Sequence, residues 1–119
     1  MDEPQALAAF TALGQEHRLR ALRALVKAGP EGLASGVLAN AIGVSASTIS
    51  FHLKELQQAG LIRSRRAGRS MIYSVAYPVL SGLIEFLMTD CCQGRPEVCA
   101  PALAALSASC AAESEVDHA

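Results

Sequence analysis

Three cysteines near the carboxyl end of the chain have the type and spacing to hold a soft ion. Cys91 and Cys92 are adjacent and Cys99 follows closely, whereas Cys110 lies farther along in a run of small residues. Thiolates are the ligands that soft ions prefer, and three of them arranged as a pyramid satisfy trivalent arsenic or antimony. A structural zinc site usually takes four ligands. We therefore predict a three-thiol site of Cys91, Cys92 and Cys99 for trivalent arsenic, with antimony and methylated arsenicals as alternatives and with Cys110 outside it.

Such a site requires the chain to fold back between Cys92 and Cys99. In a continuous helix, a rise of about 1.5 Å per residue would separate these thiols by about 10 Å along the axis, too far to share an ion. Gly94 and Pro96 are residues that end helices, so we expect a turn between the cysteines. The alternative is that the cysteines are small buried apolar residues. A disulfide between Cys91 and Cys92 is disfavoured, because adjacent Cα atoms lie only about 3.8 Å apart.

A positively charged segment precedes these thiols by about one helix. Residues 46–75 have a net charge of +4, although the whole chain has a net charge of −1. The charged residues of the segment are Lys54, Arg63, Arg65, Arg66, Arg69 and the single acidic residue Glu55. A concentrated positive surface can displace counterions from nucleic-acid phosphates. The charge distribution therefore favours binding to double-stranded DNA through this segment.

Apolar periodicity predicts the helices that position the basic segment. A first helix is expected to end near Gly14 and a second at the Gly29-Pro30 pair. A short third helix, Leu33 to Ile42, is followed by a turn residue, Gly43, and by a fourth helix that runs from an N-cap at Ser45 to about Gln58. A helix, a tight turn and a capped helix together are typical of a helix-turn-helix.

After the fourth helix the pattern changes to short extended runs. The runs Leu61–Arg65 and Ser70–Val75, joined at Ala67-Gly68, predict a β-hairpin with arginines at its tip. A last helix is expected over Pro78–Asp90. Its apolar stripe suits a dimer face and comprises Leu80, Leu83, Ile84, Leu87 and Met88. The fold class expected is mainly α with a small β-hairpin wing: a winged helix-turn-helix of about five helices.

The fourth helix has two distinct faces. At 100° per residue, Ile49, Leu53 and Leu56 form one apolar seam that we expect to point inward. The opposite face carries Ser47, Ser50, Phe51 and Lys54, which suit hydrogen bonds to base edges, contact with a thymine methyl group and contact with a phosphate or guanine. His52 lies near the seam, so a packed or phosphate-facing histidine is expected rather than a metal ligand.

Length and composition indicate one small domain. The chain has 119 residues and is 51% apolar, enough for a single core that dimerisation would help to stabilise. No apolar run reaches the length of a membrane span, and the acidic start Met1-Asp2-Glu3 lacks the basic region of a secretory signal. A cytoplasmic protein without a membrane partner is expected. In that reducing compartment, cysteines are more plausible as ligands or redox centres than as disulfides.

Four segments resemble the ArsR/SmtB family of winged-helix repressors. They are Leu38–Ser45, Ser47–Leu56, Ala59–Ile62 and Arg65–Tyr73. The likeness extends from about Ala6 to Cys92 and implies a homodimer whose first and last helices form the interface. Its two recognition helices would enter successive major grooves of an inverted repeat. The family's DNA contacts carry over to Ser47, Ser50 and Phe51 and to the wing residues Arg66 and Arg69. Lys54 and Thr48 complete the set of expected DNA-binding residues.

The resemblance also bears on the effector. The expected third helix has no cysteine and the expected last helix has no histidine, so the family's zinc sites at those places are disfavoured. The chain is similar to arsenic-responsive members with C-terminal thiols. We expect a DNA-binding domain over residues 1–92, an effector segment over residues 91–99 and a flexible tail over residues 100–119.

The function expected is repression of an arsenic-resistance operon, with release from operator DNA when trivalent arsenic binds the three cysteines. The alternative on the same scaffold is a repressor that senses thiol oxidation. An arsenate reductase or other thiol enzyme is disfavoured, because no histidine or arginine-rich phosphate loop is near a cysteine in the sequence. No catalytic cofactor is expected. An interaction module without DNA binding would leave the basic wing unexplained.

Overall fold

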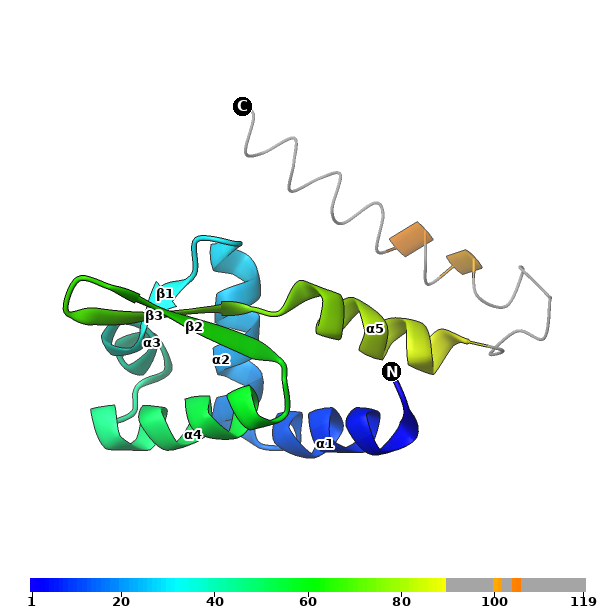
Figure 1. Ribbon diagram of the computed structural model, residues 1–119, viewed down its shortest axis with the longest axis horizontal. Coiled ribbons are helices and arrows are strands. Elements are labelled where there is room, and N and C mark those ends of the chain that lie inside the picture. The colour runs from blue at the N-terminus through cyan, green and yellow to red at the C-terminus, as the bar shows by residue number, and fades with distance from the viewer. Residues whose placement is uncertain (90–99, 102–103, 106–119) are drawn as a thin grey trace, which may run out of the picture. The chain divides into compact units, whose positions relative to one another are not determined.

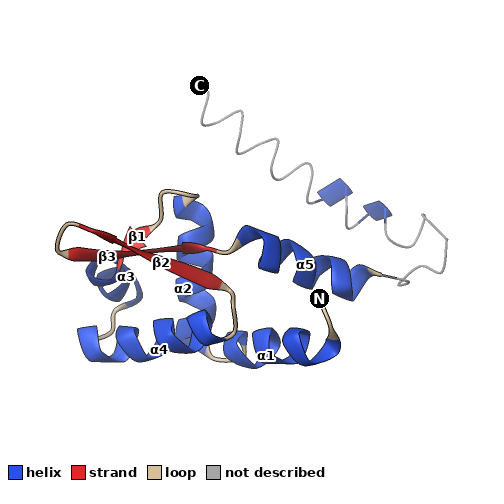
Figure 2. Cartoon of the chain, viewed as in Figure 1, coloured by secondary structure: helices blue, strands red, loops and turns tan. Residues whose placement is uncertain are grey.

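The computed structural model describes residues 1–89, 100–101 and 104–105 (Figure 1). Residues 1–86 form one compact unit and residues 87–119 a second. The elements in chain order are α1 (Glu3–Leu13), α2 (Glu16–Ala28), β1 (Leu33–Ala34), α3 (Ser35–Ile42), α4 (Ala46–Gln58), β2 (Ile62–Ala67), β3 (Ser70–Val75) and α5 (Tyr77–Met88). Figure 2 shows the helical elements in blue and the small sheet in red. The predicted winged helix-turn-helix fold with five helices is confirmed.

Side-chain caps define where the helices start. Asp2 and Gln5 form a reciprocal capping box at α1, with bonds of 2.8 and 2.9 Å. The Gln15 side chain accepts the backbone N–H of Arg18 at the start of α2. Ser45 caps α4 as expected, because its Oγ accepts the backbone N–H of Thr48 at 3.2 Å. These local bonds fix where α1, α2 and α4 begin, whereas α3 has no side-chain cap.

The sheet differs from the expected two-stranded hairpin in having a third strand. Leu33 and Ala34 pair with Tyr73 and Ile72, so the strand order is β1-β3-β2. The prediction that α3 begins at Leu33 is therefore wrong; it begins at Ser35. A two-residue strand has no periodicity of its own, and its partner lies about 40 residues away in sequence.

The wing turn and the last helix also differ from their expected bounds. β2 continues to Ala67, which pairs with Ser70, and this places the turn at Gly68-Arg69 instead of Ala67-Gly68. α5 begins at Tyr77, and its expected end at Asp90 lies outside the described residues.

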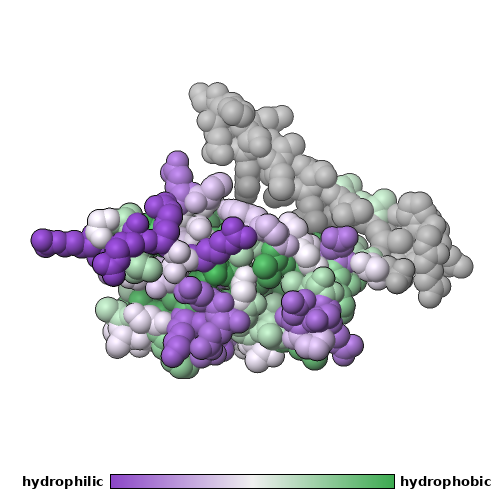
Figure 3. Space-filling view, viewed as in Figure 1, coloured by the Kyte–Doolittle hydropathy of each residue, from purple (hydrophilic) through white to green (hydrophobic). Residues whose placement is uncertain are grey.

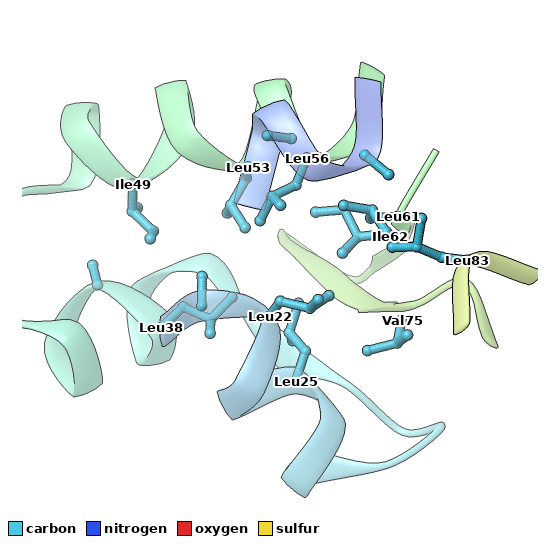
Figure 4. Close-up of a cluster of buried hydrophobic side chains, with 14 of the residues drawn as sticks. Leu22, Leu25, Leu38, Ile49, Leu53, Leu56, Leu61, Ile62, Val75 and Leu83 are labelled. Atoms are coloured by element: carbon cyan, nitrogen blue, oxygen red, sulfur yellow. The ribbon is translucent and has the colours of Figure 1, made fainter. Parts of the chain in front are cut away.

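A single apolar core joins the helices to the sheet. Its largest fully buried side chains are Leu25, Leu38, Ile49, Leu53, Leu56 and Leu61, several of which Figure 4 shows converging from α2, α3 and α4. The expected inward seam of α4 is confirmed. Leu83 of the predicted dimer stripe is instead buried in this core at 4% exposure, whereas Ile84 is exposed. The buried residues of α1 are alanines, Leu13 at its end is partly buried, and the larger side chains Leu7 and Phe10 are exposed.

Among the described residues no single helix is long and apolar enough to cross a membrane; only the bent pair α3–α4 reaches that length and composition.

Gly32 allows β1 to pair with β3, and we expect its replacement to destabilise the fold. Its φ is +74°, and a Cβ there would lie 2.1 Å from the carbonyl oxygen of Tyr73. Gly32→Ala should lower the free energy of unfolding by at least about 2 kcal/mol, measured by urea denaturation. Gly36→Ala is the matched control, because a Cβ at Gly36 meets nothing within 4 Å and that variant should be neutral or slightly stabilised. Equal stabilities of the two variants would contradict this account.

Candidate nucleic-acid interface

The helix-turn-helix is formed by α3, a glycine turn and α4. Gly43 has a φ of +82° and ends α3 in the left-handed conformation, with its N–H donating to Ala39 at 2.8 Å. The neighbouring N–H of Val44 donates to the same carbonyl at 3.0 Å. The axes of α3 and α4 differ in direction by 107°. This geometry is typical of a DNA-binding helix-turn-helix, in which the second helix lies in the major groove.

The outer face of α4 has the properties expected of a reading surface. Ser47, Ser50, Phe51 and Lys54 are all exposed, and Phe51 is 57% exposed although it is aromatic. An exposed ring at this position is available for apolar contact with a thymine methyl group. Thr48 is half-buried, and its Oγ1 accepts a hydrogen bond from Ser45 Oγ at 2.9 Å. Its hydroxyl therefore belongs to the helix cap, and the Ser47 hydroxyl lies 3.2 Å from the same Ser45 Oγ, although the Ser47 residue is exposed.

The register of the wing separates its arginines into two groups. Residues alternate between the two faces of a strand, so Arg66 shares a face with Ser64 and Arg65 points the other way. Gln57 of α4 donates to Ser64 Oγ at 3.1 Å, which identifies the face that borders α4. Arg65 instead donates from Nη2 to the carbonyl oxygen of Glu31 at 2.8 Å. Arg66 therefore projects along the α4 side of the wing, and Arg65 holds the wing to the turn after α2.

The tip of the wing is strongly hydrophilic. Arg66 and Arg69 are exposed there, next to the positive-φ residue Gly68. Figure 3 shows hydrophilic side chains gathered over this end of the wing, at the left of the view. Two exposed guanidinium groups at the end of a hairpin can contact phosphates or enter a minor groove.

His52 lies on the inner face of α4. Of the two alternatives predicted from the sequence, a packed histidine and a phosphate-facing one, the structure shows the packed one. It is only 7% exposed, and its Nδ1 lies 3.3 Å from Nη1 of Arg18. Burial lowers the pKa of His52, and the positive charges of Arg18 and His17 lower it further, while Glu55 opposes the shift. The ring is therefore neutral near pH 7.

Sequence reasoning missed Arg18. A signal was present, because Arg18 precedes Leu22 and Leu25 at helical spacing and so falls on the buried stripe of α2. A cation on an inward-facing stripe requires a partner.

The predicted thiol site lies outside the described residues, as do all four cysteines of the chain. In the part of the chain that the structure describes, no group of three or more histidine, cysteine or acidic side chains is placed to hold a metal ion.

Comparison with known proteins agrees with this geometry. A family model described as a helix-turn-helix domain matches residues 13–65. The chain is 33% identical over 88 residues to the HTH-type transcriptional regulator YgaV of Escherichia coli, covering 74% of this chain and 87% of that protein. It is also 33% identical over 75 residues to an uncharacterized HTH-type transcriptional regulator of Mycobacterium tuberculosis, covering 63% of this chain and 64% of that regulator. The chain thus spans less than two thirds of that mycobacterial protein.

Solved structures give the same result. The homodimeric winged helix-turn-helix domain of a possible ArsR-family regulator from Mycobacterium bovis matches with a TM-score of 0.60 and 28% identity, covering 73% of this chain and 81% of that one. A protein described as a possible transcriptional regulator for arsenical resistance matches with a TM-score of 0.59 and 26% identity, covering 66% and 79%.

The chain belongs to the ArsR/SmtB family of helix-turn-helix transcriptional regulators. This family is one of DNA-binding regulators of transcription and not one of enzymes.

The two groups of wing arginines should differ in the salt dependence of DNA binding. The plot of log K against log salt concentration has a negative slope. Removing a side chain that contacts a phosphate reduces the magnitude of that slope by about 1. We therefore expect Arg66→Gln and Arg69→Gln each to reduce the magnitude of the slope by about 1, measured by fluorescence anisotropy between low and moderate salt. Arg65→Gln is the matched control and should leave the slope unchanged, because Arg65 bonds to Glu31. If only Arg65→Gln reduced the magnitude of the slope, Arg65 and not Arg66 would be on the face of the wing that contacts DNA.

Proposed function

We propose that the protein is a homodimeric repressor of an arsenic-resistance operon, active in the cytoplasm, that leaves its operator when trivalent arsenic binds Cys91, Cys92 and Cys99. One observation carries the DNA-binding half of this proposal: the exposed face of α4 is bordered by the exposed arginines of the wing. The reading set on α4 is Ser47, Ser50, Phe51 and Lys54, with Thr48 at the margin of that set, and the wing contributes Arg66 and Arg69.

The donor chemistry of the chain supports arsenic as the effector. The cysteines offer three closely spaced thiolates, which satisfy a trivalent soft ion without a fourth ligand. The described residues provide no competing cluster of metal donors. The likeness to the possible regulator for arsenical resistance points in the same direction. Antimony and methylated arsenicals share this thiol chemistry and are alternative effectors.

Exposed apolar side chains support a dimer built from α1 and α5. On α1, Leu7 is 57% exposed and Phe10 is 38% exposed; on α5, Ile84 is 44% exposed and Phe86 is 37% exposed. Met1 packs near Gly82, so the start of α1 lies next to α5. The homologous domain from Mycobacterium bovis is homodimeric. Covering these side chains with a second copy would remove them from water, which favours association.

In the proposed switch, arsenic binding after α5 alters the dimer geometry and thus the spacing of the two α4 helices. A coupling free energy of about 1 to 3 kcal/mol would weaken operator binding by about 5- to 150-fold. By linkage, operator DNA weakens arsenic binding by the same factor.

Fluorescence anisotropy of the reduced protein on a labelled duplex from upstream of its own gene tests the proposal. Arsenite should release the DNA and an equal concentration of zinc should not. Release by zinc alone would contradict the three-thiol site. Release by peroxide that dithiothreitol reverses, without a response to arsenite, would favour the redox-sensing alternative.

Cys99→Ser should separate induction from repression. The variant should bind the duplex with the affinity of the wild type and lose its response to arsenite, because two thiols cannot complete the trigonal site. Cys110→Ser is the matched control and should respond normally. Loss of DNA binding in Cys99→Ser would show instead that this cysteine is structural.

A charge on the outer face of α1 should dissociate the dimer. A carboxylate at position 7 would have to be buried without a partner, so Leu7→Glu should weaken dimerisation by at least about 100-fold in sedimentation equilibrium. Leu19→Glu is the matched control, because Leu19 is 45% exposed on α2, outside the proposed interface. Equal dissociation of both variants, or of neither, would argue against this interface.

A further inference from the structure

Arg18 connects three helices at the place where α1 meets α4. Its Nε donates to the carbonyl oxygen of Ala12 at 2.6 Å, and its Nη1 lies 3.3 Å from Nδ1 of His52. A guanidinium group has only donors, so Nδ1 of His52 must accept this bond and the ring proton must be on Nε2. One side chain near the start of α2 thereby ties the end of α1 to the inner face of α4.

The end of α1 depends on this bond for its electrostatic balance. Ala12 is in the last turn of α1, where backbone carbonyls have no donor within the helix. The partial negative charge at a helix C-terminus is stabilised by a nearby cation. α1 has no basic residue in its own last turn, so Arg18 supplies this cation from α2.

Apolar packing contributes little to the same junction. The buried residues of α1 are all alanines, whose small side chains bury little area, and Leu13 at its end is only partly buried against the core. An open cavity of about 300 Å³ lies between α1 and α4, lined in part by Ala8, Ala12 and Ala59 and by the polar residues Arg18 and Glu55. Because large interlocking side chains are replaced here by alanines and a cavity, the directional bonds of Arg18 acquire more influence on the angle between the helices.

We infer that Arg18 is a positioning residue for DNA recognition: through His52 it holds α4 at a fixed orientation relative to α1. His52 precedes Leu53 of the core seam and follows Phe51, and the Phe51 and His52 rings meet edge to face with centroids 5.6 Å apart. A shift at His52 would therefore move the reading face, although His52 itself is buried and is not one of the proposed DNA contacts. The inference rests on the proposal that α4 reads the operator and is independent of the effector.

The same contact makes DNA binding sensitive to pH. Protonation of Nδ1 would remove the acceptor and place a second positive charge beside Arg18. The ionisable groups that face His52 are Arg18 and His17 from α2 and Glu55 from α4, and the net effect with burial is a lowered pKa for His52. Since the unfolded pKa is about 6.5, the neutral ring is favoured in the fold, and the contact is lost as pH falls through the lower folded pKa.

The direct test is Arg18→Lys, which keeps the charge but cannot reach both acceptors with one ammonium group. On a labelled duplex from upstream of the protein's own gene, its affinity should be about tenfold lower at pH 7.5, which corresponds to about 1.4 kcal/mol at 25 °C. Arg20→Lys is the matched control, because Arg20 is exposed and pairs with Glu16 on the helix surface. That variant should bind like the wild type.

Nuclear magnetic resonance of His52 provides a readout that general loss of stability would not change. In the wild type the ring should be protonated at Nε2 with Nδ1 accepting a hydrogen bond, and in Arg18→Lys the nitrogen-15 shift of Nδ1 should move to that of a nitrogen without a donor. His52→Asn places an oxygen close to the position of Nδ1 and should retain most of the affinity, whereas His52→Leu should not. If Arg18→Lys does not fold, these two His52 variants test whether an acceptor for Arg18 at position 52 is needed for DNA binding.

A Ser50→Ala, Phe51→Ala double variant separates the inference from the proposal on which it rests. If this variant loses affinity while folded Arg18→Lys binds like the wild type, α4 reads DNA and the role of Arg18 is overturned. If the double variant binds like the wild type, α4 is not the reading helix and the proposed interface itself fails.

Discussion

Burial of one face of α4 is the constraint on which the remaining structure depends. Ile49, Leu53 and Leu56 are each at most 1% exposed and pack against the leucines of α2 and α3. Each such side chain contributes about 1.5 to 3 kcal/mol when it leaves water. Because the seam can face only the core, the opposite side of the helix must face solvent. The packing thereby fixes the direction in which the serines and Phe51 point.

The sheet likewise fixes the directions in which the side chains of the wing point. Pairing of β3 with both β1 and β2 leaves the wing hairpin anchored at its base and free at its tip. Alternation along β2 turns Arg66 toward the α4 side and Arg65 toward the loop that contains Glu31. A cluster that is simply basic in sequence is thus divided into a part suited to DNA and a part that braces the wing.

Contacts within the core also give a signal from α5 a route to the DNA-binding elements. The N–H of Ala76 donates to the carbonyl oxygen of Leu61 at 2.9 Å, and Leu83 is buried in the same cluster as Leu61. Leu61 follows the end of α4 after only Ala59 and Gly60. Protein interiors are close-packed and hardly compressible, so they transmit displacements instead of absorbing them. A change of α5 on effector binding would therefore act on the base of the wing and on the end of α4.

By itself, the sequence determined the features that depend on near neighbours. The Ser45 cap, the seam of α4, the glycine turn after α3 and the arginines at the wing tip all follow from caps and periodicity, which act within a few residues. The three cysteines proposed as effector ligands are likewise a property of sequence alone.

Tertiary structure decided the features that join distant segments. It created β1 from Leu33 and Ala34 by pairing them with β3, buried Leu83, and turned the alanines of α1 inward. It also brought Arg18 to His52, 34 positions along the chain. Periodicity indicates that a face is buried but not which segment buries it, because that choice depends on how all the elements pack together.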